Sequence, residues 1–103
     1  MEEENEELEN ETTYYEILQE VKNEQHISPF EDDEVIIGYI KEAEFDINES
    51  SGMEIKYDED LKARSLLKMY VFYAREKRLA EFKELYAGEY ATLQAKYYKP
   101  TDV

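Results

Sequence analysis

Residues 61–74 constrain the fold of this chain more than any other stretch, because they carry apolar side chains on nearly every side of a helix. Such a helix needs protein around it, whereas a surface helix keeps a single apolar face. Asp58 is a good N-cap for this helix, and no proline follows until Pro100. The stretch therefore predicts a buried central helix in an all-α domain.

Two amphipathic patterns precede this central helix. Thr13 and Glu16 form a capping box that predicts a short helix over about residues 14–23. A longer helix is predicted over residues 32–51, with acids in its first turn and Gly52 as a left-handed cap. The apolar spacing predicts the buried faces, which are Tyr14, Ile17, Leu18 and Val21 in the first helix and Ile36, Ile40, Ala43 and Ile47 in the second.

The last part of the chain carries one apolar seam on a polar helix. Its members are spaced by three or four residues, and they are Leu79, Phe82, Tyr86, Tyr90, Leu93 and Tyr97. A bend near residues 75–79 would fold this seam back onto the core, whereas a straight rod would carry it toward another subunit. The pattern leaves both open, and it predicts a small helical bundle of about four helices with a long C-terminal helix.

The charge is unevenly distributed along the 103 residues, whose formal net charge is −15. Residues 1–60 hold 22 acids and 3 bases, whereas residues 61–103 hold 5 acids and 9 bases. A chain this acidic is a poor candidate for a simple nucleic-acid or anionic-membrane binder. We divide it into a disordered acidic arm over residues 1–12, a helical domain over residues 13–98 and a tail over residues 99–103.

The motifs of catalysis and cofactor binding are missing from the sequence. It has no cysteine, no glycine-rich phosphate loop and one histidine, His26, with no candidate partner nearby. Asp46, Asn48 and Ser50 have the spacing of a calcium loop, but Tyr57 stands where the bidentate glutamate should be. We predict a protein that is not an enzyme, with no catalytic residues, no metal and no cofactor.

The basic cluster Arg75, Lys77 and Arg78 follows directly after the central helix. Three interpretations remain open for it. The cluster contacts phosphates, or it pairs with acids of its own chain such as Glu76 and Glu81, or it meets the acidic half of a neighbouring copy. The uneven charge of the chain makes head-to-tail assembly of copies electrostatically reasonable.

The order of these features resembles a known family. Residues 13–98 include the stretches YYEILQEVKNEQHI, DDEVIIGYIKEAEFDINESSG and YDEDLKARSLLKMYVFYAREKRLAEFKELYAGEYATLQAKYY. Together they resemble the head-tail connector proteins of tailed bacteriophages, also called adaptor or head-completion proteins. The acidic arm and Gly88 depart from the family pattern.

The resemblance implies a structural neck protein of the virion, made in the host cytoplasm. It implies a dodecameric ring beneath the portal protein that extends the DNA channel and offers a platform to the next neck or tail-completion protein. DNA would pass through without sequence-specific binding, and no membrane is involved. Portal contacts are expected at the C-terminal end, on Tyr97, Tyr98, Lys99 and Pro100, and contacts between copies at Arg75, Lys77 and Arg78.

Two alternatives belong to other classes of protein. The first is an acidic mimic of DNA that inhibits a nucleic-acid-binding protein. The net basic second half of the chain argues against this function. The second is a helical interaction subunit of a cellular complex, which has the same fold but forms no ring.

Overall fold

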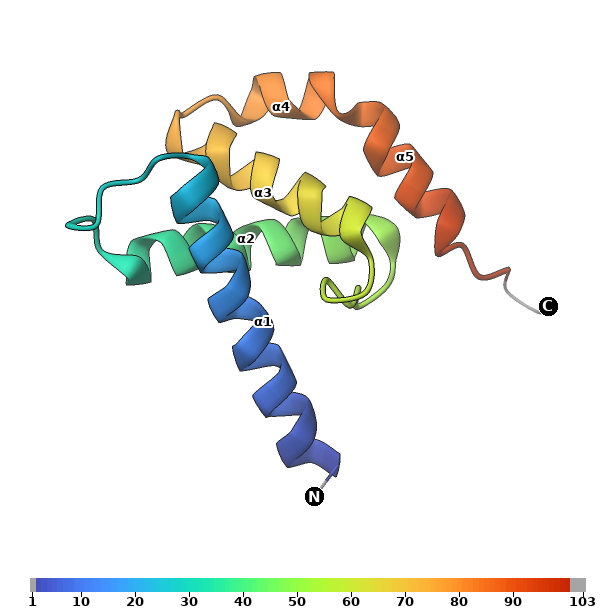
Figure 1. Ribbon diagram of the computed structural model, residues 1–103. Coiled ribbons are helices and arrows are strands. Elements are labelled where there is room, and N and C mark those ends of the chain that lie inside the picture. Colours follow the sequence, from blue (N-terminus) through green and yellow to red (C-terminus); the bar gives the residue numbers. More distant parts are fainter. Residues whose placement is uncertain (1, 101–103) are drawn as a thin grey trace.

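The described residues form five helices and contain no strand. The computed structural model describes the backbone of residues 2–100 and the side chains of residues 11–100 (Figure 1). The helices are α1 (Glu2–Glu24), α2 (Asp33–Ser51), α3 (Leu61–Arg75), α4 (Leu79–Leu85) and α5 (Ala87–Lys96). The predicted all-α class is therefore confirmed.

Helix α3 is the central helix, as its composition predicts. It packs against α2, α1 and α4, and Figure 1 shows it lying between α2 and α4. The buried side chains share one broad face of the helix and do not surround it as predicted, because Leu61, Lys62 and Ser65 on the opposite side are exposed. The buried residues are Ala63, Arg64, Leu66, Leu67, Tyr70, Val71 and Ala74. The helix begins two residues later than expected, because Asp60 and not Asp58 is its N-cap and accepts the Ala63 N–H at 3.1 Å.

The predicted stripe of α2 is confirmed, because its four residues Ile36, Ile40, Ala43 and Ile47 are all fully buried. Asp32 caps the helix by accepting the N–H of Glu34 at 2.9 Å. On α1, Ile17, Leu18 and Val21 are buried as expected. These apolar faces of α1 and α2 join α3 in one hydrophobic core.

Helix α1 begins at Glu2, well before the capping box from which the sequence predicts a start. The backbone is thus helical across most of the acidic arm over residues 1–12, and Figure 1 shows these first turns extending away from the other helices. Glutamate is a good helix former and is favoured near a helix N-terminus, which explains the continuation. The disorder of the arm in solution stays a prediction, and Met1 lies outside the described residues.

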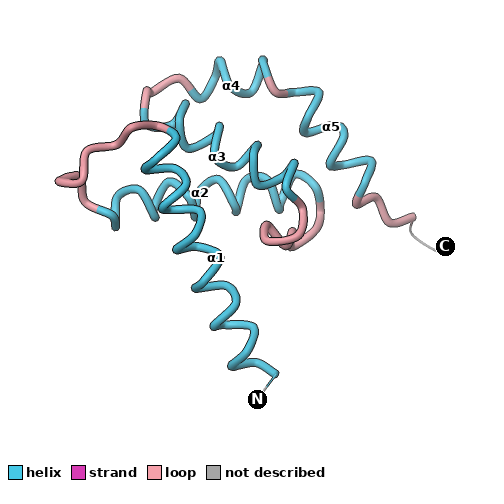
Figure 2. The backbone as a smooth tube through the Cα atoms, viewed as in Figure 1, coloured by secondary structure: helices cyan, strands magenta, loops and turns pink. Residues whose placement is uncertain are grey.

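The seam of the last segment folds back onto the core, so the bent alternative is the one observed. Phe82 is fully buried, and its ring lies 5.4 Å from that of Tyr70 and 4.9 Å from that of Tyr86. The expected long C-terminal helix is instead two short helices separated at Tyr86, as the tube in Figure 2 shows. The break lets α4 pack on α3 while α5 packs on α2.

Three helices end in the same way, on a residue with left-handed backbone geometry. These residues are His26 (φ 52°), Gly52 (φ 73°) and Lys77 (φ 61°), in the loops after α1, α2 and α3 (Figure 2). In each loop the following N–H turns back to a carbonyl of the last helical turn, for example from Arg78 to Tyr73 at 2.8 Å. This is the Schellman arrangement, in which glycine is the preferred residue.

Only one of these three residues is a glycine, which gives a test of the backbone geometry. Gly52→Ala should lower the free energy of unfolding by about 1 kcal/mol, because an L side chain is strained at positive φ. Lys77→Gly should raise it by up to about 1 kcal/mol for the same reason. Gly38 lies inside α2 with no atom within 4 Å of an added Cβ, so Gly38→Ala is the control and should stabilise. Urea unfolding measures all three, and destabilisation by Lys77→Gly would contradict the assigned turn.

Candidate functional site: the charged network, the basic cluster and the C-terminal segment

The bases of the second half of the chain are mostly paired inside the molecule. Six of the nine bases after residue 60 form ion pairs, and five of these six pair with acids from residues 1–60. The pairs are Arg64 with Glu20 and Glu16, Lys68 with Glu20 and Glu24, Arg75 with Glu31, Arg78 with Glu81, Lys83 with Asp46, and Lys96 with Asp60. Most of the bases of the second half therefore join α3, α4 and α5 to the first 60 residues.

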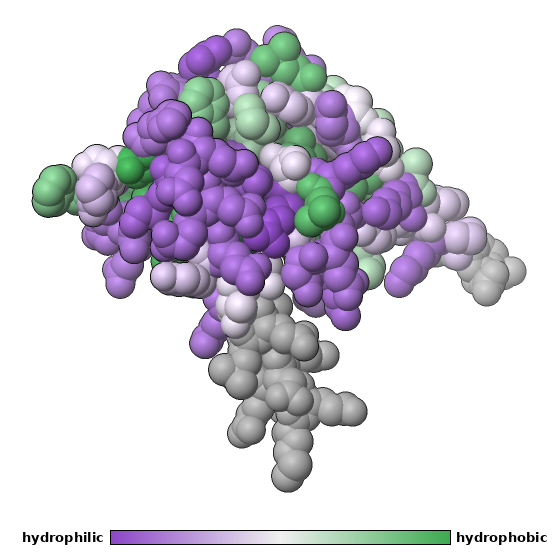
Figure 3. All heavy atoms as spheres, in the orientation of Figure 1, coloured by the Kyte–Doolittle hydropathy of each residue, from purple (hydrophilic) through white to green (hydrophobic). Residues whose placement is uncertain are grey.

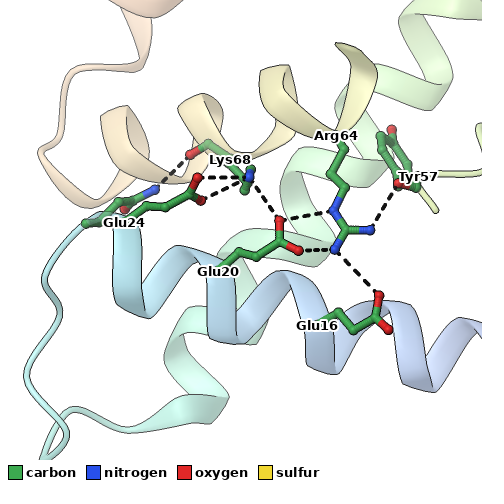
Figure 4. Close-up of polar contacts among 7 residues, drawn as sticks. Glu16, Glu20, Glu24, Tyr57, Arg64 and Lys68 are labelled. Carbon is green, nitrogen blue, oxygen red and sulfur yellow. Dashed lines mark hydrogen bonds and ion pairs between the residues drawn. The ribbon is translucent and has the colours of Figure 1, made fainter. Parts of the chain in front are cut away.

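Arg64 is the centre of this network (Figure 4). The Arg64 side chain is buried, and it donates hydrogen bonds to the carboxylate of Glu20 from both Nε and a terminal nitrogen. The other terminal nitrogen of Arg64 donates a hydrogen bond to the Tyr57 carbonyl at 3.4 Å. Lys68, one turn further along α3, reaches Glu20 at 2.9 Å and Glu24 at 2.9 Å. Glu20 thus bridges two bases and fixes α1 against α3.

The pKa values of the network follow from these contacts. The hydrogen bond from Arg64 lowers the pKa of Glu20, and the same bond raises the pKa of Arg64. Burial alone would lower the pKa of Lys68, but its hydrogen bonds to Glu20 and Glu24 raise it overall. All three groups are therefore charged at neutral pH, as a paired network requires.

Asp60 joins the start of α3 to the end of α5. Its carboxylate accepts hydrogen bonds from Lys96 Nζ at 2.9 Å and from the Tyr97 hydroxyl at 2.6 Å, in addition to the capping hydrogen bond from the Ala63 N–H. Burial alone would raise the pKa of Asp60, but these three hydrogen bonds lower it to about 2. The contact fixes the point at which the C-terminal segment leaves the bundle.

The lowered pKa of Asp60 makes its stabilising contribution depend on pH. The unfolded carboxyl, with a pKa near 3.9, takes up a proton before the folded one. The contribution is therefore complete above about pH 4 and is lost as the pH falls toward 2. Asp60→Asn keeps a capping side chain but removes the charge, and it should lower the free energy of unfolding at pH 7 by about 1–2 kcal/mol, since exposed Lys96 is screened by solvent.

Urea unfolding between pH 7 and pH 2 checks this expectation. The difference between the native chain and Asp60→Asn should shrink below about pH 4. Asp58→Asn is the matched control, because Asp58 is exposed and has no ion pair among the described side chains. A difference that stays constant down to pH 2 would contradict the assigned role of the Asp60 charge.

The three residues of the basic cluster lie in different settings. Arg75 Nη2 lies 3.4 Å from Glu31 and Nη1 lies 3.4 Å from the side-chain oxygen of Gln25, so it holds the loop between α1 and α2. Arg78 is exposed and pairs with Glu81 at 2.7 Å. Lys77 is exposed and has no ion-pair partner among the described side chains. Pairing within the chain, one of the three interpretations, therefore holds for Arg75 and Arg78.

The four residues expected to contact a portal divide into two groups. Tyr97 packs against the core and donates to Asp60, so it belongs to the bundle. Tyr98, Lys99 and Pro100 are exposed beyond α5, and 71% of the surface of Tyr98 is accessible. The remainder of the tail, residues 101–103, lies outside the described residues. A short segment with an exposed aromatic side chain thus leaves a rigid anchor at Asp60.

The calcium-like spacing on α2 has structural uses. Asn48 accepts the Tyr57 hydroxyl at 2.8 Å and the Ile55 N–H at 3.2 Å, which orders the connector before α3. Asp46 accepts the Tyr90 hydroxyl at 2.6 Å and holds α5 on α2. Within residues 11–100, no group of three or more candidate ligands is arranged to hold a metal ion. None of the described helices is long and apolar enough to cross a membrane.

Sequence reasoning missed Arg64 and Asp60, although a signal for the first was present. An arginine inside an otherwise apolar helix is rarely buried without a carboxylate partner, and α1 offers a glutamate on every turn. The role of Asp60 depends on the tertiary approach of α5, which no local pattern encodes. Both residues join elements that are far apart in the sequence.

Known proteins offer no further guide to the class of this chain. No protein-family model matches it, no curated protein is similar to it, and no solved structure matches its fold. The candidate site therefore has to be interpreted from its own residues.

Proposed function

We propose that this chain is a head-tail connector of a tailed bacteriophage, a structural protein of the virion neck. It forms a dodecameric ring beneath the portal, extends the DNA channel and receives the next neck or tail-completion protein. DNA passes through the ring without sequence-specific binding. In this role α4 and α5 act together as the long C-terminal arm of a bundle of about four helices.

The observation that carries the proposal is the C-terminal segment. Asp60 clamps Tyr97 and Lys96 to the bundle, and directly after this clamp Tyr98, Lys99 and Pro100 present an aromatic ring and a cation with no partner among the described side chains. A rigid anchor followed by an exposed aromatic side chain suits binding to a protein partner, because tyrosine adds contact area at low entropic cost. The portal is the partner that the family resemblance supplies.

Mixing the full chain with the portal ring of the same genome tests this proposal. We expect co-sedimentation and a new layer of density on the narrow end of the portal in negative-stain images. Deletion of residues 98–103 should abolish binding without unfolding the bundle, because the deletion spares the Tyr97 clamp. Tyr98→Ala should weaken binding about tenfold or more.

Tyr15→Ala is the matched control, because Tyr15 is an exposed tyrosine on α1 with 64% of its surface accessible. It should leave portal binding unchanged. Equal losses for Tyr15→Ala and Tyr98→Ala, or no binding of the full chain to an intact portal near physiological salt, would overturn the proposal.

Within the ring, Lys77 and Arg78 are the residues through which the basic cluster meets a neighbour's acids. Arg75 acts indirectly, by holding the loop after α1. Lys77→Glu should reduce the number of copies retained on the portal, because like charges then face each other at the contact. Lys56→Glu is the control, since it makes the same charge change on an exposed residue of the connector. Native mass spectrometry of the complex counts the copies, and equal effects of both changes would argue against this contact.

An acidic mimic of DNA is the second candidate, and one observation favours it. The bases that counted against this function are largely neutralised inside the molecule, so the accessible surface is more acidic than the composition of the second half suggests. Carboxylates such as Glu49, Glu54 and Glu59 are exposed. Displacement of duplex DNA from a basic target by this chain would favour the mimic over the connector.

A further inference from the structure

Phe30 is the most exposed large apolar side chain in the described part of the molecule, with 96% of its surface accessible. It lies on the loop between α1 and α2. Figure 3 shows a hydrophobic protrusion at the left edge of the molecule, where Figure 1 places this loop. Val35, on the first turn of α2, is also half-exposed and widens the apolar surface near the loop. A phenylalanine ring gains free energy when it leaves water, so Phe30 is able to contribute to a contact with an apolar groove.

The loop holds Phe30 in place. The Phe30 N–H donates to the Ser28 hydroxyl at 3.2 Å, and the Glu31 N–H donates to the Ser28 carbonyl at 3.1 Å. Arg75 binds the loop from α3 through Gln25 and Glu31. The backbone of such a fixed turn loses little conformational entropy when Phe30 binds.

A receptor for such a side chain exists on the same chain. A groove of about 750 Å³ lies between α3 and the segment formed by Tyr86 and α5. Its apolar lining comes mainly from Leu61, Leu66, Met69, Tyr86 and Leu93. The Leu61 side chain is 66% exposed although it belongs to the first turn of the central helix. The groove is large enough for one aromatic ring and its flanking residues.

The charges beside the two features include one pair of opposite sign. Glu34 follows Phe30 on the first turn of α2, and it has no ion-pair partner among the described side chains. Lys62 lies at the rim of the groove, and it also lacks an ion-pair partner there. The other acids after Phe30 are engaged, since Glu31 pairs with Arg75, Asp32 caps α2 and Asp33 pairs with Lys22. Glu34 and Lys62 therefore remain to meet across a contact, and Lys62 offsets the negative charge of Glu89, which lines the same groove without an ion pair among the described side chains.

The protruding loop and the groove lie at opposite ends of the molecule. Figure 1 places the loop at one end, and the start of α3 with α5 at the other. A projection and a receptor at different places on one chain make a heterologous contact, which repeats head to tail and closes into a ring when the rotation allows.

We propose that Phe30 of one copy inserts into the groove between α3 and α5 of the next, with Glu34 facing Lys62. The inference deepens the proposed function, on which its ring-forming consequence rests, by giving the copies a specific apolar contact. The contact itself requires only this chain, so its test needs no portal.

Two variants isolate the contact, because each one disables a single side of it. Phe30→Ala removes the projection and keeps the groove. Leu61→Glu blocks the groove and keeps Phe30, and the fold should tolerate it because Leu61 is exposed in the first turn of α3, where a carboxylate is favourable. Neither variant alone should self-associate through this contact, whereas the mixture should form a one-to-one complex.

Titration of isotope-labelled Phe30→Ala with unlabelled Leu61→Glu, followed by NMR up to millimolar concentration, measures the complex. Amide shifts are expected at Leu66, Met69 and Thr92, which line the groove. Adding Phe30→Ala to the second partner as well should weaken binding about tenfold or more. Absence of shifts at these amides at millimolar concentration, or self-association that Phe30→Ala leaves unchanged, would overturn the inference.

A charge exchange tests the register of the contact. Lys62→Glu on the labelled partner, or Glu34→Lys on the other, should each weaken the complex about three- to fivefold, and both together should restore it. Loss without restoration would place the contact elsewhere. Failure of this titration while the full chain still binds a portal would reject the contact and leave the connector function standing, and the reverse outcome would reject the connector function alone.

Discussion

The ion pair between Arg64 and Glu20 is the interaction on which the arrangement of the helices depends most. Arg64 is buried in the central helix, and a buried guanidinium is tolerable only with a carboxylate in bidentate contact. Glu20 supplies this carboxylate from α1 and also receives Lys68. The acidic first helix is therefore the counter-charge of the central helix, and the uneven charge along the sequence becomes a set of contacts inside one monomer.

This internal pairing changes what the surface can do. Lys62, Lys77 and Lys99 are the only bases after residue 60 that lack an ion-pair partner among the described side chains. General attraction between an acidic half and a basic half can therefore contribute little to the association of copies, because the charges that would drive it are already satisfied. The assembly that we propose therefore relies on exposed apolar side chains such as Phe30 and Tyr98, with single charges setting the register.

The spacing of apolar residues predicted most of the core, whereas capping residues predicted fewer of the helix boundaries. The stripe of α2 and the seam through Phe82 and Leu93 were predictable because helical spacing determines which side chains share a face. The left-handed ends at His26 and Lys77 were not, because neither residue is the glycine that most strongly indicates such a turn in a sequence. The break at Tyr86 was missed for a tertiary reason, since the seam continues across it while its two halves meet different helices. Of the candidate site, the exposed C-terminal residues were predictable from their position, whereas the Asp60 clamp was not.

The turn at Lys77 affects the positions of features at both ends of the molecule. It ends α3 directly after Arg75, so the guanidinium of Arg75 lies at the end of the helix and reaches the loop that carries Phe30. The same turn reverses the chain so that α4 and α5 run back along the core, and Tyr86 with α5 forms one wall of the groove. One backbone feature thus positions both the projection and its receptor. A change in the geometry of this turn would move both features together, so in the head-to-tail assembly that we propose the spacing of copies would be set within the monomer.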